Sequence, residues 1–197
     1  MSRNILLCGV GGQGTVLTSK LIAAAAMEKG LHVMSAETIG MAQRGGSVYG
    51  NVRIGDDVHS PLIGTGEADL LIGFEPGETV RMLPYLKEGG TVVTNSDAVK
   101  PASSSLKKMR YEGSDMTEYL KKTVDPESLI IVDGRRITKE LGSPRVLNTV
   151  LLGAALSAGV LPVSKEDIEC ALKSTVKKSY IDINLKALRY CDEVINH

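Results

Sequence analysis

The first half of the chain alternates short apolar runs with segments in which apolar residues recur at helical spacing. Runs that predict buried or half-buried strands cover residues 4–8, 31–36, 48–54, 69–73, 91–94 and 129–132. Helical patterns lie between them, over residues 13–29, 75–86 and 116–122. Strands separated by helix-length segments indicate a mainly parallel sheet with helices on both faces. We therefore expect an α/β fold, a Rossmann-like three-layer sandwich with a helical C-terminal region, and one domain over residues 1–197.

The last third of the chain is predicted to be helical. Residues 147–158 are apolar around nearly the whole helix, which indicates either burial within the chain or cover by a partner. Ser164 and Asp167 resemble a capping box at the start of the next helix. A closing helix is expected from about Ile181 to Ile195, whereas residues 95–128 carry the weakest pattern.

Glycine-rich or polar segments follow most of the predicted strands. They are residues 9–14, 37–46, 75–76, 95–97 and 133–135. In open α/β sheets, ligands bind beyond the carboxyl ends of the strands. We expect these segments to gather along one edge of the sheet.

The segment 9–14, Gly-Val-Gly-Gly-Gln-Gly, stands between a predicted strand and a predicted helix. Glycines let a ligand approach the backbone, and the free N–H groups of a helix N-terminus attract phosphate. A dinucleotide site also requires an acidic residue at the end of the second strand, where Glu37 stands rather late. The pattern therefore leaves open a nicotinamide or flavin site and a tight turn that only packs strand on helix.

A second concentration of unusual residues runs from Glu37 to Ser47. Arg44 precedes Gly45 and Gly46, which places a planar cation beside accessible backbone amides. That combination suits a phosphate or a carboxylate. An arginine on an exposed hairpin accounts for the same residues.

The amino-acid composition argues against several classes of function. Lys plus Arg and Asp plus Glu both number 23, a balance that gives no electrostatic footprint for nucleic acid or an anionic membrane. No apolar run approaches the roughly 20 residues that span a bilayer, and no signal-peptide pattern is present, so we expect a cytoplasmic protein. The three cysteines, Cys8, Cys170 and Cys191, are too scattered for an iron–sulfur or zinc site. No set of residues suited to acid–base or nucleophilic catalysis is evident, so we assign no catalytic residue.

The two glycine-containing motifs resemble a known family. Residues 9–14 with residues 36–48 resemble the gamma domain of pyruvate:ferredoxin oxidoreductases, and the second motif is similar to the small (beta) subunit of the indolepyruvate type. Residues 148–154, Asn-Thr-Val-Leu-Leu-Gly-Ala, resemble a late helix of the family. The similarity covers nearly the whole chain and is weakest from about Lys100 to Ser128.

The resemblance implies an enzyme that oxidatively decarboxylates aryl-2-oxoacids such as indolepyruvate with coenzyme A (CoA), giving an aryl-acetyl-CoA, carbon dioxide and reduced ferredoxin. Thiamine diphosphate and iron–sulfur clusters would reside on a large alpha subunit. This chain would be inactive alone and would bind no cofactor tightly, with CoA as its candidate ligand. A homodimer is the candidate state of the chain without its partner.

The resemblance also implies site residues. Contacts to the phosphates of CoA are implied for Gly9, Gly11, Gly12, Gln13 and Gly14. Contacts to substrate, CoA or the partner subunit are implied for Glu37, Gln43, Arg44, Gly45, Gly46, Ser47 and Asn148.

Three other interpretations stay open. The chain could be an NAD-binding dehydrogenase that uses its glycine loop for the cofactor. It could be a non-catalytic module that binds a nucleotide or CoA. The enzyme could also act on pyruvate or another 2-oxoacid, because the reacting carbon would meet mainly the thiamine-bearing subunit.

Overall fold

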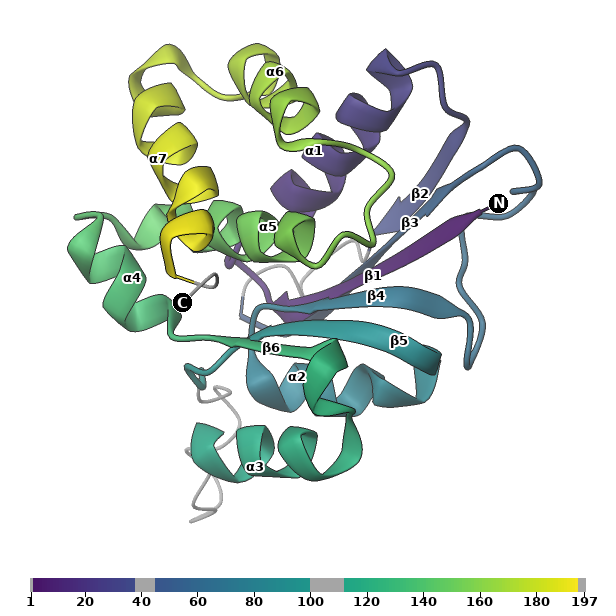
Figure 1. Ribbon diagram of the computed structural model, residues 1–197, viewed down its shortest axis with the longest axis vertical. Helices are drawn as coiled ribbons and strands as arrows, with labels where there is room; N and C mark the ends of the chain where they lie inside the picture. The colour runs from purple at the N-terminus through teal and green to yellow at the C-terminus, as the bar shows by residue number, and fades with distance from the viewer. Residues whose placement is uncertain (1, 38–44, 100–111, 195–197) are drawn as a thin grey trace.

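A six-stranded sheet forms the centre of the molecule (Figure 1). The computed structural model describes residues 2–37, 45–99 and 112–194, with side chains described to residue 190. In spatial order the strands are β2 (Val33–Glu37), β3 (Ser47–Ile54), β1 (Arg3–Val10), β4 (Ala68–Gly73), β5 (Leu86–Asn95) and β6 (Leu129–Val132). Strands β1, β4, β5 and β6 run parallel, and β3 is antiparallel to both of its neighbours. The predicted α/β fold with a mainly parallel sheet is confirmed.

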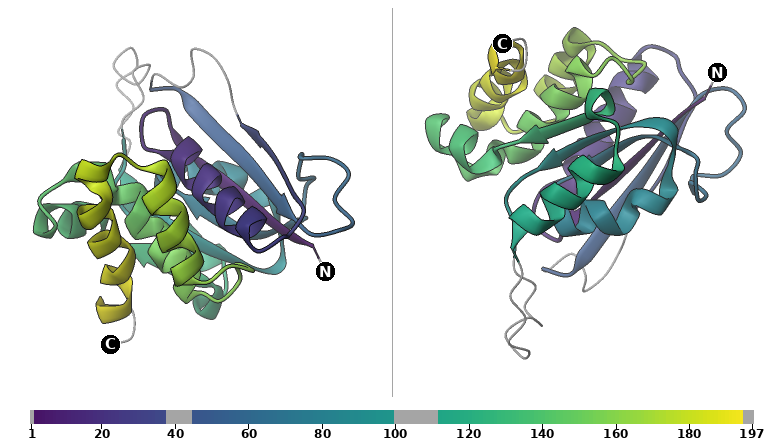
Figure 2. Two further views of the ribbon diagram at one scale, coloured as in Figure 1. Left: turned by 90° about the horizontal axis from the view of Figure 1, so that it is seen from above. Right: turned by 60° about the horizontal axis from the view of Figure 1, so that its bottom comes forward.

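Helices cover both faces of the sheet (Figures 1 and 2). On one face lie α1 (Thr15–Glu28) and α5 (Leu147–Ser157), with α6 (Lys165–Thr175) and α7 (Lys178–Val194) packed outside them. On the other face lie α2 (Pro76–Met82) and α3 (Gly113–Thr123). Helix α4 (Gly134–Glu140) follows β6 and contacts α5. Short 3₁₀ turns cover Leu83–Tyr85, Pro126–Ser128 and Pro144–Val146. Among the described residues, no helix has the length and apolar character needed to cross a membrane.

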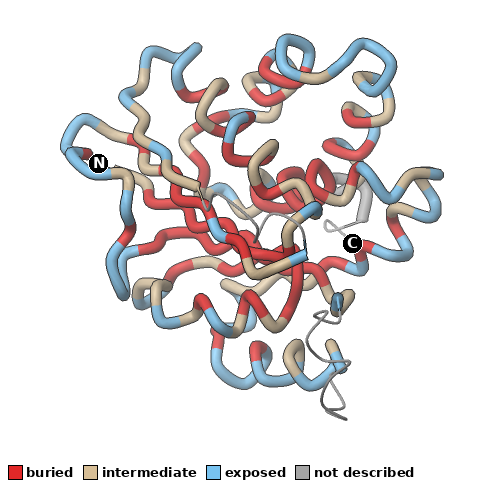
Figure 3. The backbone as a smooth tube through the Cα atoms, turned by 180° about the vertical axis from the view of Figure 1, so that it is seen from behind, coloured by how far each residue is buried: buried red, intermediate tan, exposed pale blue. Residues whose placement is uncertain are grey.

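Helix α5 is apolar on all sides, and other elements of this chain cover it. Its residues from Asn148 to Ala155 are all buried between the sheet and α7 (Figure 3). A Cβ added at Gly153 would lie 2.5 Å from the carbonyl oxygen of Leu188 in α7, so a glycine is required for the close helix contact. Of the two explanations for the apolar pattern, burial within the chain is sufficient.

Three local features differ from the sequence expectation. The helix predicted for residues 75–86 ends at Met82, and β5 already begins at Leu86, because Pro84 cannot continue the hydrogen-bonded helix. Helix α4 had no predicted bounds of its own, although the last third of the chain was expected to be helical. Strand β3 is less exposed than its alternation suggests, since Asn51 is buried and its amide oxygen accepts a hydrogen bond from the N–H of Ile63 (3.4 Å).

The predicted common edge is confirmed. The carboxyl ends of the parallel strands β1, β4, β5 and β6 meet at one side of the sheet, and β2 ends at the same side because two antiparallel pairings restore its direction. The glycine loop, Glu75, Asn95 and Asp133 therefore follow strand ends at one edge. Asp133 caps α4, with its carboxylate accepting a hydrogen bond from the N–H of Arg136 (3.0 Å).

Candidate functional site

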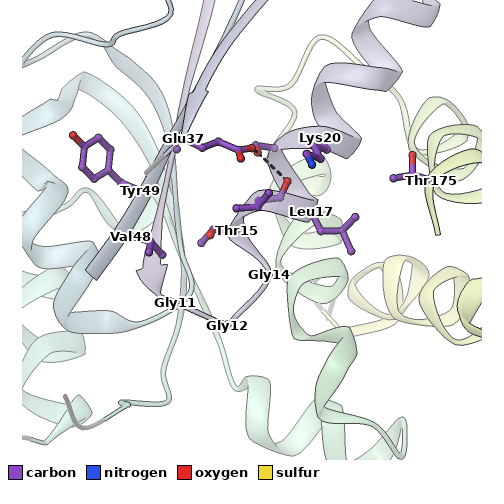
Figure 4. A pocket seen from close by; sticks show the side chains of 13 residues that line it. Gly11, Gly12, Gly14, Thr15, Leu17, Lys20, Glu37, Val48, Tyr49 and Thr175 are labelled. Atoms are coloured by element: carbon purple, nitrogen blue, oxygen red, sulfur yellow. Dashed lines mark hydrogen bonds between the residues drawn. The ribbon is translucent and has the colours of Figure 1, made fainter. Parts of the chain in front are cut away.

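A groove of about 520 Å³ lies between the first half of α1 and strands β2 and β3 (Figure 4). Its floor is the glycine loop, and Thr175 at the end of α6 closes one side. The lining residues are Gly11, Gly12, Gly14, Thr15, Val16, Leu17, Ser19, Lys20, Glu37, Val48, Tyr49, Gly50 and Thr175. Four of the predicted site residues, Gly11, Gly12, Gly14 and Glu37, thus share one groove.

The first part of the glycine loop, which consists of Gly9, Val10 and Gln13, is bonded into the protein. The N–H of Val10 donates to Oε1 of Gln13 (2.7 Å), and Nε2 of Gln13 donates to the carbonyl of Phe74 (3.1 Å) at the end of β4. A Cβ added at Gly9 would lie 2.7 Å from Cβ of Phe74 and 2.8 Å from Oε1 of Gln13. Gly9 and Gln13 therefore shape the turn from within.

The second part, which consists of Gly12 and Gly14, presents backbone N–H groups that the protein leaves unbonded among the described residues. Gly12 has a φ of +102°, and a Cβ added there would meet no atom within 4 Å. Gly14, with a φ of +94°, is the N-cap of α1. The N–H groups of Gly12, Gly14 and Thr15 find no acceptor among the described residues. Free N–H groups at the start of a 14-residue helix form a site for an anion.

Asn148, at the start of α5, packs directly against this helix terminus. A Cβ added at Gly14 would lie 3.0 Å from Cβ and 3.3 Å from Nδ2 of Asn148. The Asn148 side chain is only 3% exposed, and its amide has no hydrogen-bond partner in the described part of the chain. No fully buried side-chain polar atom there lacks a partner, so the amide keeps some contact with solvent at the loop.

The second motif joins the glycine loop through its described end. The N–H of Gly11 donates to the carbonyl of Gly46 (2.8 Å), next to Gly45 with its φ of +87°. The hydroxyl of Ser47 donates to Oε2 of Glu78 (2.6 Å), so it is directed toward α2 and away from the groove. Gln43 and Arg44 lie outside the described residues.

Glu37 does not occupy the position that a dinucleotide site requires. In that arrangement the acidic residue ends the strand next to the glycine-loop strand. Here the antiparallel strand β3 lies between β2 and β1. The carboxylate of Glu37 instead accepts a hydrogen bond from the hydroxyl of Ser19 on α1, inside the groove (Figure 4). This topology weakens the interpretation as a nicotinamide or flavin site.

Lys20 and Asn95 are two polar residues at this edge that were not among the predicted site residues, although residues 95–97 were expected at the edge. Lys20 lines the groove, and its position could have been found from its place on α1 only with knowledge that the helix packs beside β2 and β3. Asn95 is buried at the end of β5, where its amide donates to the carbonyl of Phe74 (3.2 Å) and accepts from the N–H of Gly134 (3.1 Å). It joins the ends of three parallel strands.

The described residues hold no reactive thiol or metal cluster at this edge. Burial raises the pKa of the Cys8 thiol far above its usual range, and the nearby carboxylate of Glu78 raises it further. No group of three or more His, Cys, Asp or Glu side chains in residues 2–37, 45–99 and 112–190 could hold a metal ion.

Comparison with known proteins decides the family. The sequence profile described as pyruvate ferredoxin/flavodoxin oxidoreductase matches residues 4–191. The chain belongs to this family. It is 41% identical over 189 residues to indolepyruvate oxidoreductase subunit IorB of Archaeoglobus fulgidus, covering 96% of this chain and 93% of that protein. The predicted family, of indolepyruvate type, is confirmed, and the chain is the small subunit of a 2-oxoacid:ferredoxin oxidoreductase.

Solved structures of the family share the fold. Pyruvate oxidoreductase subunit PORC of Thermotoga maritima superposes with a TM-score of 0.69 at 25% identity, covering 98% of this chain and 96% of that chain. A 2-oxoglutarate:ferredoxin oxidoreductase from Magnetococcus marinus, solved with 2-oxoglutarate, coenzyme A and succinyl-CoA bound, gives a TM-score of 0.71. At 19% identity it shows the fold alone, and this chain covers 99% of its own length and 31% of that longer polypeptide.

Proposed function

We propose that this subunit serves an enzyme that converts aryl-2-oxoacids such as indolepyruvate, with CoA, to aryl-acetyl-CoA and carbon dioxide. Two electrons leave the acyl carbon for ferredoxin. The near full-length match to an indolepyruvate oxidoreductase subunit at 41% identity supports the aryl substrate. Pyruvate is the principal alternative, since the pyruvate oxidoreductase subunit of Thermotoga has the same fold.

The chemistry of carbon dioxide release belongs to a second polypeptide in this proposal. A large alpha subunit would carry thiamine diphosphate and the iron–sulfur clusters. The Magnetococcus protein supports such a partner, because there this fold accounts for about a third of one longer chain (31%). The small subunit contributes a surface beside the active site.

The contribution of this chain would be to hold the phosphates of CoA. The observation that carries the proposal is the second part of the glycine loop. The N–H groups of Gly12, Gly14 and Thr15 have no acceptor in the described part of the chain. The amide of Asn148, a residue that is only 3% exposed, stands beside them and also has no partner among the described residues. A diphosphate accepts hydrogen bonds from such donors.

The remaining predicted residues take different parts in this proposal. Gly11 and Gly46 bond to each other, and Gly9 and Gln13 hold the shape of the loop. Gln43, Arg44 and Gly45 are proposed to contact CoA, the 2-oxoacid or the partner subunit.

Reconstitution with the large subunit tests the proposal. The small subunit alone should reduce neither ferredoxin nor a viologen dye, whereas the co-purified complex should do so with indolepyruvate and CoA together. Omission of CoA should abolish thioester formation, and addition of NAD should not replace ferredoxin. Turnover by the isolated small subunit, or preference for pyruvate over indolepyruvate, would contradict the assignment.

A further inference from the structure

We propose that Lys20 and Glu37 recognise the phosphorylated ribose of CoA and so distinguish CoA from dephospho-CoA. The inference rests on the proposed function, in which the diphosphate of CoA lies at the glycine loop. It adds a second contact region in the same groove, for the 3′-phosphate and the neighbouring 2′-hydroxyl of the ribose.

Lys20 provides a second positive charge along the same helix. It lies five residues after Thr15 on α1, so it is about 7–8 Å farther along the helix axis than the start of the helix. Figure 4 shows it on the α1 side of the groove, between Glu37 and Thr175. The groove therefore has two separate places for an anion, the helix N-terminus and the ammonium group.

The ammonium of Lys20 is available for a ligand. It is exposed and makes no ion pair or hydrogen bond with any described residue. Lys29 on the same helix is different, because its ammonium lies 3.1 Å from the carboxylate of Asp167. Lys20 thus has no ionic partner among the described residues, whereas Lys29 forms an ion pair with α6.

Glu37 provides the complementary acceptor. One of its carboxylate oxygens accepts the hydrogen bond from Ser19, which fixes the side chain against α1. The other oxygen has no hydrogen-bond partner in the described part of the chain. A carboxylate accepts a hydrogen bond from a sugar hydroxyl and repels a phosphate, so the Glu37 side of the groove favours the ribose position that carries no phosphate.

The carboxylate of Glu37 and the ammonium of Lys20 together match one kind of ribose. Lys20 and Glu37 are not within ion-pair distance of each other, so neither neutralises the other. A ribose with one hydroxyl and one phosphate monoester satisfies both, whereas unphosphorylated ribose leaves Lys20 without a partner. Val16, Leu17 and Val48 add apolar lining to the groove, and its volume of about 520 Å³ lies within the usual range for small-molecule sites.

Kinetics of the two-subunit complex with CoA and dephospho-CoA test the inference. The wild-type complex should show a KM for dephospho-CoA at least about tenfold higher than for CoA, the effect of one charge-assisted hydrogen bond. Lys20→Met should raise the KM for CoA by about the same factor, so that the ratio of the two KM values approaches one. Lys20→Arg should restore part of the discrimination. Lys186→Met, at an exposed position on α7 remote from the groove, is the matched control and should keep the wild-type ratio.

The outcomes separate this inference from the proposed function. A wild-type complex that uses both thiols equally well would overturn the role of Lys20 and leave CoA as the acceptor. An unchanged KM ratio in Lys20→Met would do the same. A complex that reduces ferredoxin without forming a thioester from either thiol would overturn the proposed function, and this inference with it.

Discussion

The two parts of the glycine loop interleave in the sequence, with Gln13 between Gly12 and Gly14, but use their polar groups in opposite directions. In the first part, the N–H of Val10 and the side-chain amide of Gln13 are bonded to the protein, and Gly9 lies against the buried ring of Phe74. In the second part, the N–H groups of Gly12 and Gly14 have no acceptor in the described residues.

This difference shows that glycine is needed for two different reasons within one motif. Gly9 leaves room for the end of β4, because a Cβ there would lie 2.7 Å from Phe74. Gly12 has open space where its Cβ would be, and its φ of +102° is a conformation that other residues rarely adopt. A substitution in the first part should therefore affect folding, and a change in the second should affect ligand binding.

The largest effect is expected from Gly9→Ala. The added methyl group meets Phe74, which is fully buried, and the side chain of Gln13. Overpacking of this kind lowers the free energy of unfolding by about 3 kcal/mol, the upper part of the usual range. Urea denaturation of the isolated subunit measures it. A variant as stable as the wild type would show that the loop is loosely packed and would remove the contrast between its two parts.

A somewhat smaller loss, about 2 kcal/mol, is expected from Gln13→Leu. The change leaves the N–H of Val10 without its acceptor, and an unsatisfied buried group costs about 1–3 kcal/mol. The carbonyl of Phe74 loses one of its two donors and keeps the amide of Asn95. If Gln13→Leu instead leaves stability intact and raises the KM for CoA, Gln13 belongs to the ligand-binding part.

The sequence pattern could predict most of the fold because alternation and helical spacing report directly on burial. The six strands, the common edge and the capping box of Ser164 and Asp167 were all expected, and all are present. The position of β3 between β1 and β2 was not predictable from the pattern. Strand order depends on contacts between residues far apart in the chain, which local periodicity does not encode.

The site was predictable in its location but not in the roles of its residues. The glycine spacing predicted the position of the loop. It could not show that the Gln13 side chain bonds inward or that Glu37 contacts Ser19 on α1. Those roles depend on neighbouring elements, the end of β4 in one case and the intervening β3 in the other. For the same reason the sequence pattern could not identify Lys20 as a groove residue, because that role depends on the packing of α1 beside β2 and β3.

The substitution Asn148→Ala tests ligand binding at the second part of the loop, against which Asn148 packs. Its amide has no protein partner in the described chain, so the stability loss should be smaller than for Gln13→Leu. A hydrogen bond to a charged group contributes about 1.5–3 kcal/mol, so the KM of the complex for CoA should rise at least about tenfold. The KM for indolepyruvate should stay within twofold. Loss of stability without any change in the KM for CoA would place Asn148 in the structural part.

The smallest effect is expected from Asp167→Asn, in the capping box of α6 and away from the loop. The hydrogen bond from the N–H of Ser164, with a smaller contribution from Lys29, holds the pKa of Asp167 below its usual value of 3.8. Because the folded pKa is the lower one, the stabilisation is fully present above the unfolded pKa and is lost as the pH falls through the folded value.

At neutral pH the Asp167→Asn variant should therefore be less stable by roughly 0.5 kcal/mol, the usual contribution of an acidic side chain to a helix N-terminus. The difference from the wild type should disappear at a pH below that folded pKa, as measured by urea denaturation across the acid range. The KM for CoA should not change. This substitution thus calibrates how much a purely structural loss, of known cause, disturbs the kinetics of the complex. A CoA effect as large as that of Asn148→Ala would mean that any weakening of the fold reaches the groove, and the division of the loop into two parts would no longer hold.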